Sequence, residues 1–191
     1  MLNGLGAPCL SSGVKHLAPM TGEDILNEIG LKAYKKPLSA IRSQPGWPCL
    51  KHPLHVAILI IDFDSEVNMN GLLGFLENST GAYLDQTIEA FRVVGAQPTA
   101  NTLSAVRELM GRQGVSHQRL REPHRHTTEY QTTTFAELHG SALDDFAEGV
   151  GRLEDLLYVH DQAQESPFPK MEAYVEGHAA EIQAEMRRIG A

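Results

Sequence analysis

The sequence predicts an all-α, or nearly all-α, single domain built as a bundle of several helices. Apolar residues recur every three or four positions in several segments, which is the spacing of one face of a helix. The run richest in β-branched residues, 54–61, has no second segment with which it could pair as a strand. A lone strand would leave its backbone groups without hydrogen bonds, so this run is predicted to be a buried helix.

The first helix is predicted over residues 21–36. Thr21 and Asp24 have the spacing of a capping box, in which each side chain bonds the backbone of the other residue. An apolar stripe follows, and lysines end the segment, where the helix dipole favours cations. The stripe is Ile25, Leu26, Ile29 and Ala33, and the lysines are Lys35 and Lys36. We therefore expect residues 21–191 to form the domain and residues 1–20 to be a flexible extension.

The middle of the chain is predicted to hold further helices separated by turns. A proline-rich break at 43–53 precedes the buried helix, and a short apolar helix over 71–78 is expected to end at the sequence Asn-Ser-Thr-Gly. Asn and Gly between these two helices tolerate left-handed backbone angles, so residues 68–71 are predicted to reverse the chain. Gly95 is placed to end the next helix, and Pro98 to begin the one after it.

The C-terminal part is predicted to contain a long polar loop and then three helices. Residues 116–134 are polar and are expected to form the loop. Residues 135–162 favour two helices with a break near Gly149 or Gly151. The final helix has the clearest stripe, in which His178 is expected to be a hydrogen-bonded core histidine. The stripe is Met171, Val175, His178, Ile182, Met186 and Ile189.

Charge is concentrated at one end of the sequence. The net charge is −8, and residues 126–191 hold 13 acidic and 4 basic residues. This balance opposes sequence-independent binding of nucleic acid and docking on anionic membranes, both of which need Lys and Arg. It favours a partner with a basic surface, although a solvated acidic face that only maintains solubility would look the same. The two cysteines, Cys9 and Cys49, form no ligand-spaced set, so a reducing cytoplasm is expected.

No group of residues predicts an active site or a cofactor. Asp62, Asp64 and Glu66 are two apart, so on a helix they point in different directions and are expected to be a solvent-exposed charged helix end. His124 and His126 could bind a metal ion, but a metal site needs three or four ligands. The motifs of serine hydrolases, P-loops and dinucleotide sites are missing. The local basic cluster, formed by Arg119, Arg121 and Arg125, could bind a phosphate or a nucleic acid, but it is expected instead to pair with the acidic C-terminal third.

The stretch from residue 66 to residue 81 carries a recognisable pattern of an acidic residue, amides, glycines and an aromatic residue. The pattern is Glu66, Val67, Asn68, Gly71, Phe75, Asn78, Ser79 and Gly81. It resembles the bacterial DNA mimic protein 19-like family, also described as domain of unknown function 4375, from which Met69, Asn70 and Gly74 depart. The resemblance covers residues 48–110 best and the C-terminal part more loosely. The resemblance implies a mostly helical protein whose carboxylates imitate DNA phosphates and occupy the DNA-binding face of a transcription factor.

The hypothesis is therefore a non-enzymatic, acidic protein-binding module that occupies a basic surface of a partner and binds no nucleic acid directly. The alternatives are an immunity protein that neutralises a bacterial toxin and a metal-dependent enzyme that uses His124 and His126. The oligomeric state stays open. Charge density, rather than the family motif, selects the candidate partner-binding residues, which are Asp144, Asp145, Glu148, Glu154, Asp155 and Asp161.

Overall fold

A computed structural model of the 191-residue chain describes residues 20–126, 134–160 and 165–191. Every regular element in these ranges is a helix, which confirms the predicted fold class. The predicted extension, residues 1–20, lies outside the described residues except for Met20. The α-helices are α1 (Gly22–Lys32), α2 (Pro53–Glu77), α3 (Leu84–Val93), α4 (Gln97–Gln113), α5 (His117–Arg121), α6 (Phe135–His139), α7 (Asp144–Glu154), α8 (Phe168–Gly177) and α9 (Ala179–Ile189). Four short 3₁₀ helices are η1 (Leu38–Ser43), η2 (Ser79–Tyr83), η3 (Pro123–His126) and η4 (Gly140–Leu143).

Helix α1 begins as the sequence predicts. The Thr21 side chain accepts a hydrogen bond from the Asp24 backbone N–H (3.2 Å), and the Asp24 carboxylate accepts one from the Thr21 N–H (3.0 Å). This reciprocal pair satisfies two backbone donors that a helix start otherwise leaves open. The apolar stripe of α1 is buried, and it packs on α2 and α8.

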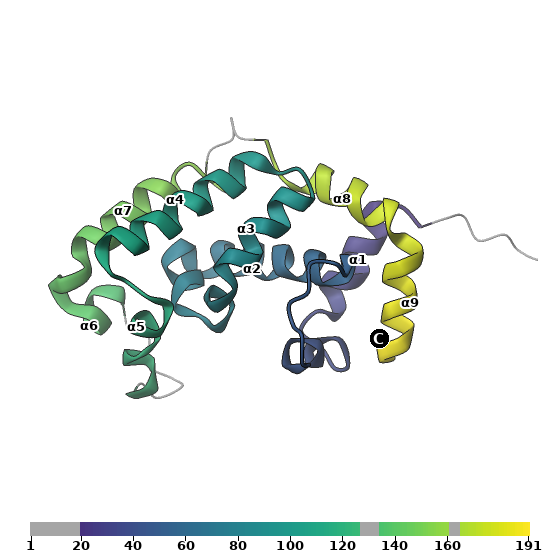
Figure 1. The fold of residues 1–191 in the computed structure, drawn as a ribbon, viewed down its shortest axis with the longest axis horizontal. Helices are drawn as coiled ribbons and strands as arrows, with labels where there is room; N and C mark the ends of the chain where they lie inside the picture. Colours follow the sequence, from purple (N-terminus) through teal and green to yellow (C-terminus); the bar gives the residue numbers. More distant parts are fainter. Residues whose placement is uncertain (1–19, 127–133, 161–164) are drawn as a thin grey trace, which may run out of the picture.

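Helix α2 is the centre of the fold. Every residue from Leu54 to Ile60 is buried and all but His55 are apolar, which is the signature of a core helix. Figure 1 shows α2 running through the middle of the molecule, with α1, α8 and α9 gathered at one end and α5, α6 and α7 at the other. The prediction of a buried helix rather than a strand is confirmed.

The prediction that residues 68–71 form a chain-reversing turn is wrong. The structure has instead a kink within α2 at one residue. Within α2 only Gly71 departs from helical angles (φ 70°, ψ 178°), and no residue other than glycine has a positive φ among the described residues. Asn68, Met69 and Asn70 stay helical. The short helix expected at 71–78 is therefore the second segment of α2.

Two further predicted boundaries are wrong. Part of the expected polar loop folds as α5 and η3, with Ser116 capping the Arg119 N–H (3.1 Å). The expected break near Gly149 or Gly151 instead falls at Gly140 (φ 60°), which follows the last residue of α6 and begins η4. Gly149 lies inside α7. A Cβ there would come within 2.8 Å of the Leu109 side chain, so the glycine permits close packing of α7 on α4.

The last predicted helix is divided into α8 and α9 at His178 (φ −115°, ψ 16°). The division lets α8 pack on α1 while both helices contact α2. His178 is half-buried rather than a full core residue, but its Nδ1 lies 2.8 Å from the Tyr174 carbonyl oxygen and its ring stacks on Tyr174. The predicted stripe residues Met171, Val175, Ile182 and Met186 are all buried. Across the described ranges, no helix combines the length and the hydropathy needed to cross a membrane.

Candidate functional site

Helix α7 presents a stripe of acidic side chains to solvent. Asp144 and Glu148 lie in α7, and Asp155 is the residue with helical angles that follows its last residue; separations of four and seven residues place the three on one face, with Asp145 beside them. All four are exposed. From Asp144 to Asp155 the stripe extends about 16 Å along the helix axis, given a rise of about 1.5 Å per residue. We call these four residues the α7 acidic stripe.

The carboxylates of the stripe differ in how much the protein itself uses them. Glu148 forms an exposed ion pair with Arg152. Asp144 and Asp145 lie in the first turn of α7, where the helix dipole favours negative charge. Within residues 20–126, 134–160 and 165–191, the side chains of Asp144, Asp145 and Asp155 form no ion pair or hydrogen bond.

Glu154, the remaining described candidate, is turned away from this stripe. Its Oε2 accepts the Leu72 backbone N–H (3.1 Å), and its Oε1 accepts a hydrogen bond from His160 Nε2 (3.2 Å). Leu72 directly follows the kink at Gly71, so Glu154 caps the second segment of α2 as a side chain caps a helix start. Its side chain is 21% exposed. The last candidate, Asp161, lies outside the described residues.

The carboxylates of α2 do not form a cluster, as predicted, but the expectation of a solvent-exposed helix end is wrong. Asp62 is buried and forms a two-pronged pair with the Arg42 guanidinium group, at 2.5 and 2.9 Å. Asp64 accepts the Tyr158 hydroxyl (2.7 Å), and burial is the main reason that the pKa of Tyr158 lies above its ordinary value. Each carboxylate thus connects α2 to a segment distant in the sequence.

Part of residues 66–81, which we call the family-like stretch, lines a cavity beside the segment of α2 that follows the kink. A cavity of about 390 Å³ is bordered by residues of α2, η3 and α6. Glu66 accepts hydrogen bonds from the side-chain amides of Asn70 (3.1 Å) and Asn78 (2.5 Å), which holds both amides at this end. The lining residues are Asn70, Leu73, Gly74, Glu77, Asn78, His124 and Phe135.

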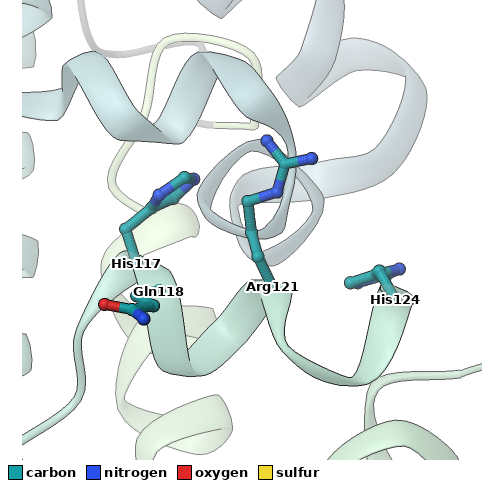
Figure 2. Close-up of a pocket in the computed structure, with 4 residues that line it drawn as sticks. All are labelled: His117, Gln118, Arg121 and His124. Carbon is teal, nitrogen blue, oxygen red and sulfur yellow. The ribbon is translucent and has the colours of Figure 1, made fainter. Parts of the chain in front are cut away.

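A second cavity adjoins the first through His124, which lines both. It measures about 370 Å³ and is lined by His117, Gln118, Arg121 and His124. Figure 2 shows His117 and Arg121 rising from the same side of α5, with His124 on the turn that follows. His117 Nε2 donates a hydrogen bond to the Asn78 carbonyl oxygen (2.8 Å), so the family-like stretch positions this ring.

Glu77 stands between the two histidine-bearing segments. Its Oε1 accepts a hydrogen bond from His139 Nε2 (2.7 Å) and lies 3.5 Å from His124 Nε2. His139 could not be predicted from the sequence, because it is 62 residues from Glu77 in the chain and no spacing pattern connects them. The described residues hold no group of three potential ligands that could bind a metal ion, and the side chain of His126 lies outside them.

The expected pairing of the basic cluster with the acidic C-terminal third is not found for Arg119 and Arg121. Among the described residues neither guanidinium group forms an ion pair or a hydrogen bond, and the side chain of Arg125 lies outside that set. Most other arginines are paired with carboxylates. They are Arg42, Arg92, Arg107, Arg112, Arg152 and Arg188.

Comparison with known proteins gives one match. Residues 49–178 match the family model described as DMP19-like protein, which covers more than half of the chain, from the start of α2 to the end of α8. No curated protein and no solved structure matches the chain.

Proposed function

Because this chain belongs to the DMP19-like protein family, we propose that it is a non-enzymatic, cytoplasmic protein of the DNA mimic kind that occupies a basic surface of a partner protein. The family match carries this proposal, because it spans α7 and therefore the α7 acidic stripe. The partner in this proposal is a DNA-binding regulator. The surface that it offers is the surface that normally contacts DNA phosphates.

The α7 acidic stripe has the chemistry that such a partner would recognise. Carboxylates and phosphates are both anionic acceptors, and both bind the fork of an Arg guanidinium group or a Lys ammonium group. Asp144, Asp145 and Asp155 have no competing cation within the described part of the chain, so their charge is available to a partner. Charges mounted on a packed helix are held in place before binding, which limits the entropy lost on association. Glu154 is excluded from the proposed surface because the fold uses its carboxylate.

Affinity capture followed by mass spectrometry tests the class of partner. We expect the immobilised chain to recover a basic DNA-binding protein, and DNA containing that protein's site to compete for it. Binding should weaken steeply as salt rises, because exposed charges are screened over about 10 Å at 0.1 M. Recovery of a toxin such as a nuclease would support the immunity alternative instead. An affinity for the captured regulator that does not change with salt would contradict an electrostatic surface.

Substitutions in α7 test the location of the surface. The triple variant Asp144→Asn, Glu148→Gln, Asp155→Asn should weaken binding of the captured partner by roughly tenfold or more, since charge-assisted pairs are each worth about 1.5–3 kcal/mol. The control is Glu23→Gln, Glu176→Gln, Glu181→Gln, which removes three exposed carboxylates from α1, α8 and α9. If both variants bind equally weakly, overall charge rather than the α7 acidic stripe determines binding.

Neighbouring residues 154 and 155 separate binding from folding. Glu154→Ala should lower the free energy of unfolding by about 1 kcal/mol, because it removes the oxygen that accepts the Leu72 N–H and with it the helix cap. Asp155→Asn should leave stability unchanged and weaken partner binding. The reverse pattern in urea denaturation and binding measurements would show that the two roles are assigned to the wrong residues.

A further inference from the structure

The two cavities beside the kink of α2 have a different chemistry from the acidic surface. Their combined lining contains one arginine and two histidines, and the cavities are about 370 and 390 Å³, within the range of small-molecule pockets. The protein carries a net charge of −8. Arg121 belongs to the lining of the first cavity, in which the described residues include no carboxylate, whereas the lining of the second cavity includes Glu77.

Arg121 is the residue that gives the first cavity its charge. It lies four residues after His117, so the two side chains share a face of α5, and both line the cavity. The Arg121 guanidinium group has no ion-pair or hydrogen-bond partner among the described residues. Gln118 adds an amide donor at the same cavity. A guanidinium group and an amide N–H are donors that recognise a phosphate group, and the His117 ring, whose Nε2 donates to the Asn78 carbonyl oxygen, borders the same cavity.

Glu77 is the carboxylate that could oppose an anion here, and the fold restrains it. Glu77 lines the second cavity, not the first, and its side chain is 11% exposed. Its Oε1 accepts the His139 N–H and lies 3.5 Å from His124 Nε2, and His124 is the described residue common to both linings. Among the described residues, the lining of the first cavity is one arginine, two histidines and one glutamine, with no carboxylate.

The second cavity has the complementary chemistry of hydrogen-bond acceptors. Both Asn70 and Asn78 use their side-chain nitrogens to bond Glu66. This leaves their side-chain oxygens as acceptors at the cavity that they line. A ligand that extended from the first cavity into the second would meet these acceptors with hydroxyl or amino groups.

We propose that the paired cavities bind a small phosphate ester, with its phosphate group at Arg121, His117 and Gln118 and a hydroxyl- or amino-bearing body at Asn70 and Asn78. This site is independent of the α7 acidic stripe. In this proposal the family-like stretch both shapes α2 and supplies residues that contact the ligand.

Calorimetric titration of the full chain tests the phosphate part of this proposal, with inorganic phosphate and ribose 5-phosphate as probes at constant ionic strength. Both probes should bind the wild-type protein. Arg121→Gln should weaken both by roughly tenfold or more, because it removes a charge-assisted pair. Arg119→Gln is the matched control: it removes the same charge two residues away, from an exposed side chain that does not line the cavity. Absence of binding to the wild type, or equal losses in the two variants, would overturn the phosphate site.

Comparison of the two probes tests the second cavity. Ribose 5-phosphate should bind at least tenfold more tightly than inorganic phosphate, and Asn70→Ala should remove that advantage while leaving inorganic phosphate binding unchanged. Equal affinity for the two probes would overturn the role of Asn70 and Asn78. Unfolding curves of each variant, measured in parallel, separate loss of binding from loss of folding.

Discussion

At the scale of single residues, neighbouring carboxylates in this chain have unrelated roles. Glu154 caps a helix segment, whereas Asp155, the next residue, is exposed. Asp62 is buried against Arg42, whereas Asp64 bonds a tyrosine hydroxyl from the other end of the chain. Local charge density treats all of these groups alike. Only their partners reveal which carboxylates remain for binding.

His55 is a buried titratable residue that makes stability sensitive to acid. Its side chain lies in the core at 9% exposure, and its Nδ1 accepts the Cys49 backbone N–H (2.9 Å). Burial, with a smaller effect from the nearby charge of His52, lowers the pKa of His55 from 6.5 to about 4. The neutral ring is therefore the folded form, and the hydrogen bond from Cys49 requires it.

Stability should fall as the pH drops from 6.5 toward 4. In this window the unfolded chain binds a proton at residue 55 that the folded chain does not, so acid favours unfolding. At about 1.4 kcal/mol per pKa unit, the loss attributable to His55 is on the order of 3 kcal/mol once the pH is below 4. Urea denaturation at several pH values should show a shallower acid slope for His55→Gln than for the wild type. Identical slopes in the two proteins would contradict this assignment.

At the scale of elements, α2 depends on one glycine. Gly71 adopts φ 70°, in the region that favours glycine, and a Cβ there would also lie 3.0 Å from the Glu154 carboxylate. The kink lets the buried first half of α2 stay in the core while the second segment reaches α5 and the cavities. Glu154 then caps the Leu72 N–H that the kink exposes.

Gly71→Ala should lower the free energy of unfolding by about 1–3 kcal/mol, because alanine pays for the same backbone angles with strain. The control is Gly111→Ala, in the exposed part of α4, where a Cβ would meet no atom within 4 Å. That change should be neutral or stabilising by up to about 1 kcal/mol, since alanine is the better helix former. Equal effects of the two substitutions in urea denaturation would show that the kink carries no backbone constraint.

At the scale of the whole molecule, the described helices share one apolar core. One hydrophobic cluster contains buried residues of α1 to α5 and of α7 to α9. The two ends of the described chain also meet, because α1 packs on α8 and Gln183 contacts Met20 at 3.2 Å. One continuous core favours one cooperative unit.

We therefore expect residues 21–191 to unfold in a single transition. Trp47, the one tryptophan of the chain, packs on His55 and Tyr83 with ring centroids 4.8 and 6.3 Å away, so its fluorescence reports on one part of the core. Far-UV circular dichroism reports on all helices. The two denaturation curves should coincide, and separate midpoints would divide the chain into more than one unit.

Local sequence patterns were enough to predict the fold class, the capping box of α1, the buried start of α2 and the helix limits at Gly95 and Pro98. These features depend on apolar periodicity and on local hydrogen bonds within about four residues, which a sequence displays directly. The sequence also suggested the family to which the chain belongs.

The tertiary structure alone decided the kink at Gly71, the uninterrupted helix through Gly149 and the division of the last helix at His178. It also decided that Glu154 serves the fold, that His139 bonds Glu77 and that Arg121 faces a cavity instead of a carboxylate. Each of these depends on atoms that are distant in the sequence and adjacent in space. Local pattern carries no information about such neighbours, because burial and partner choice are set by the packing of the whole chain.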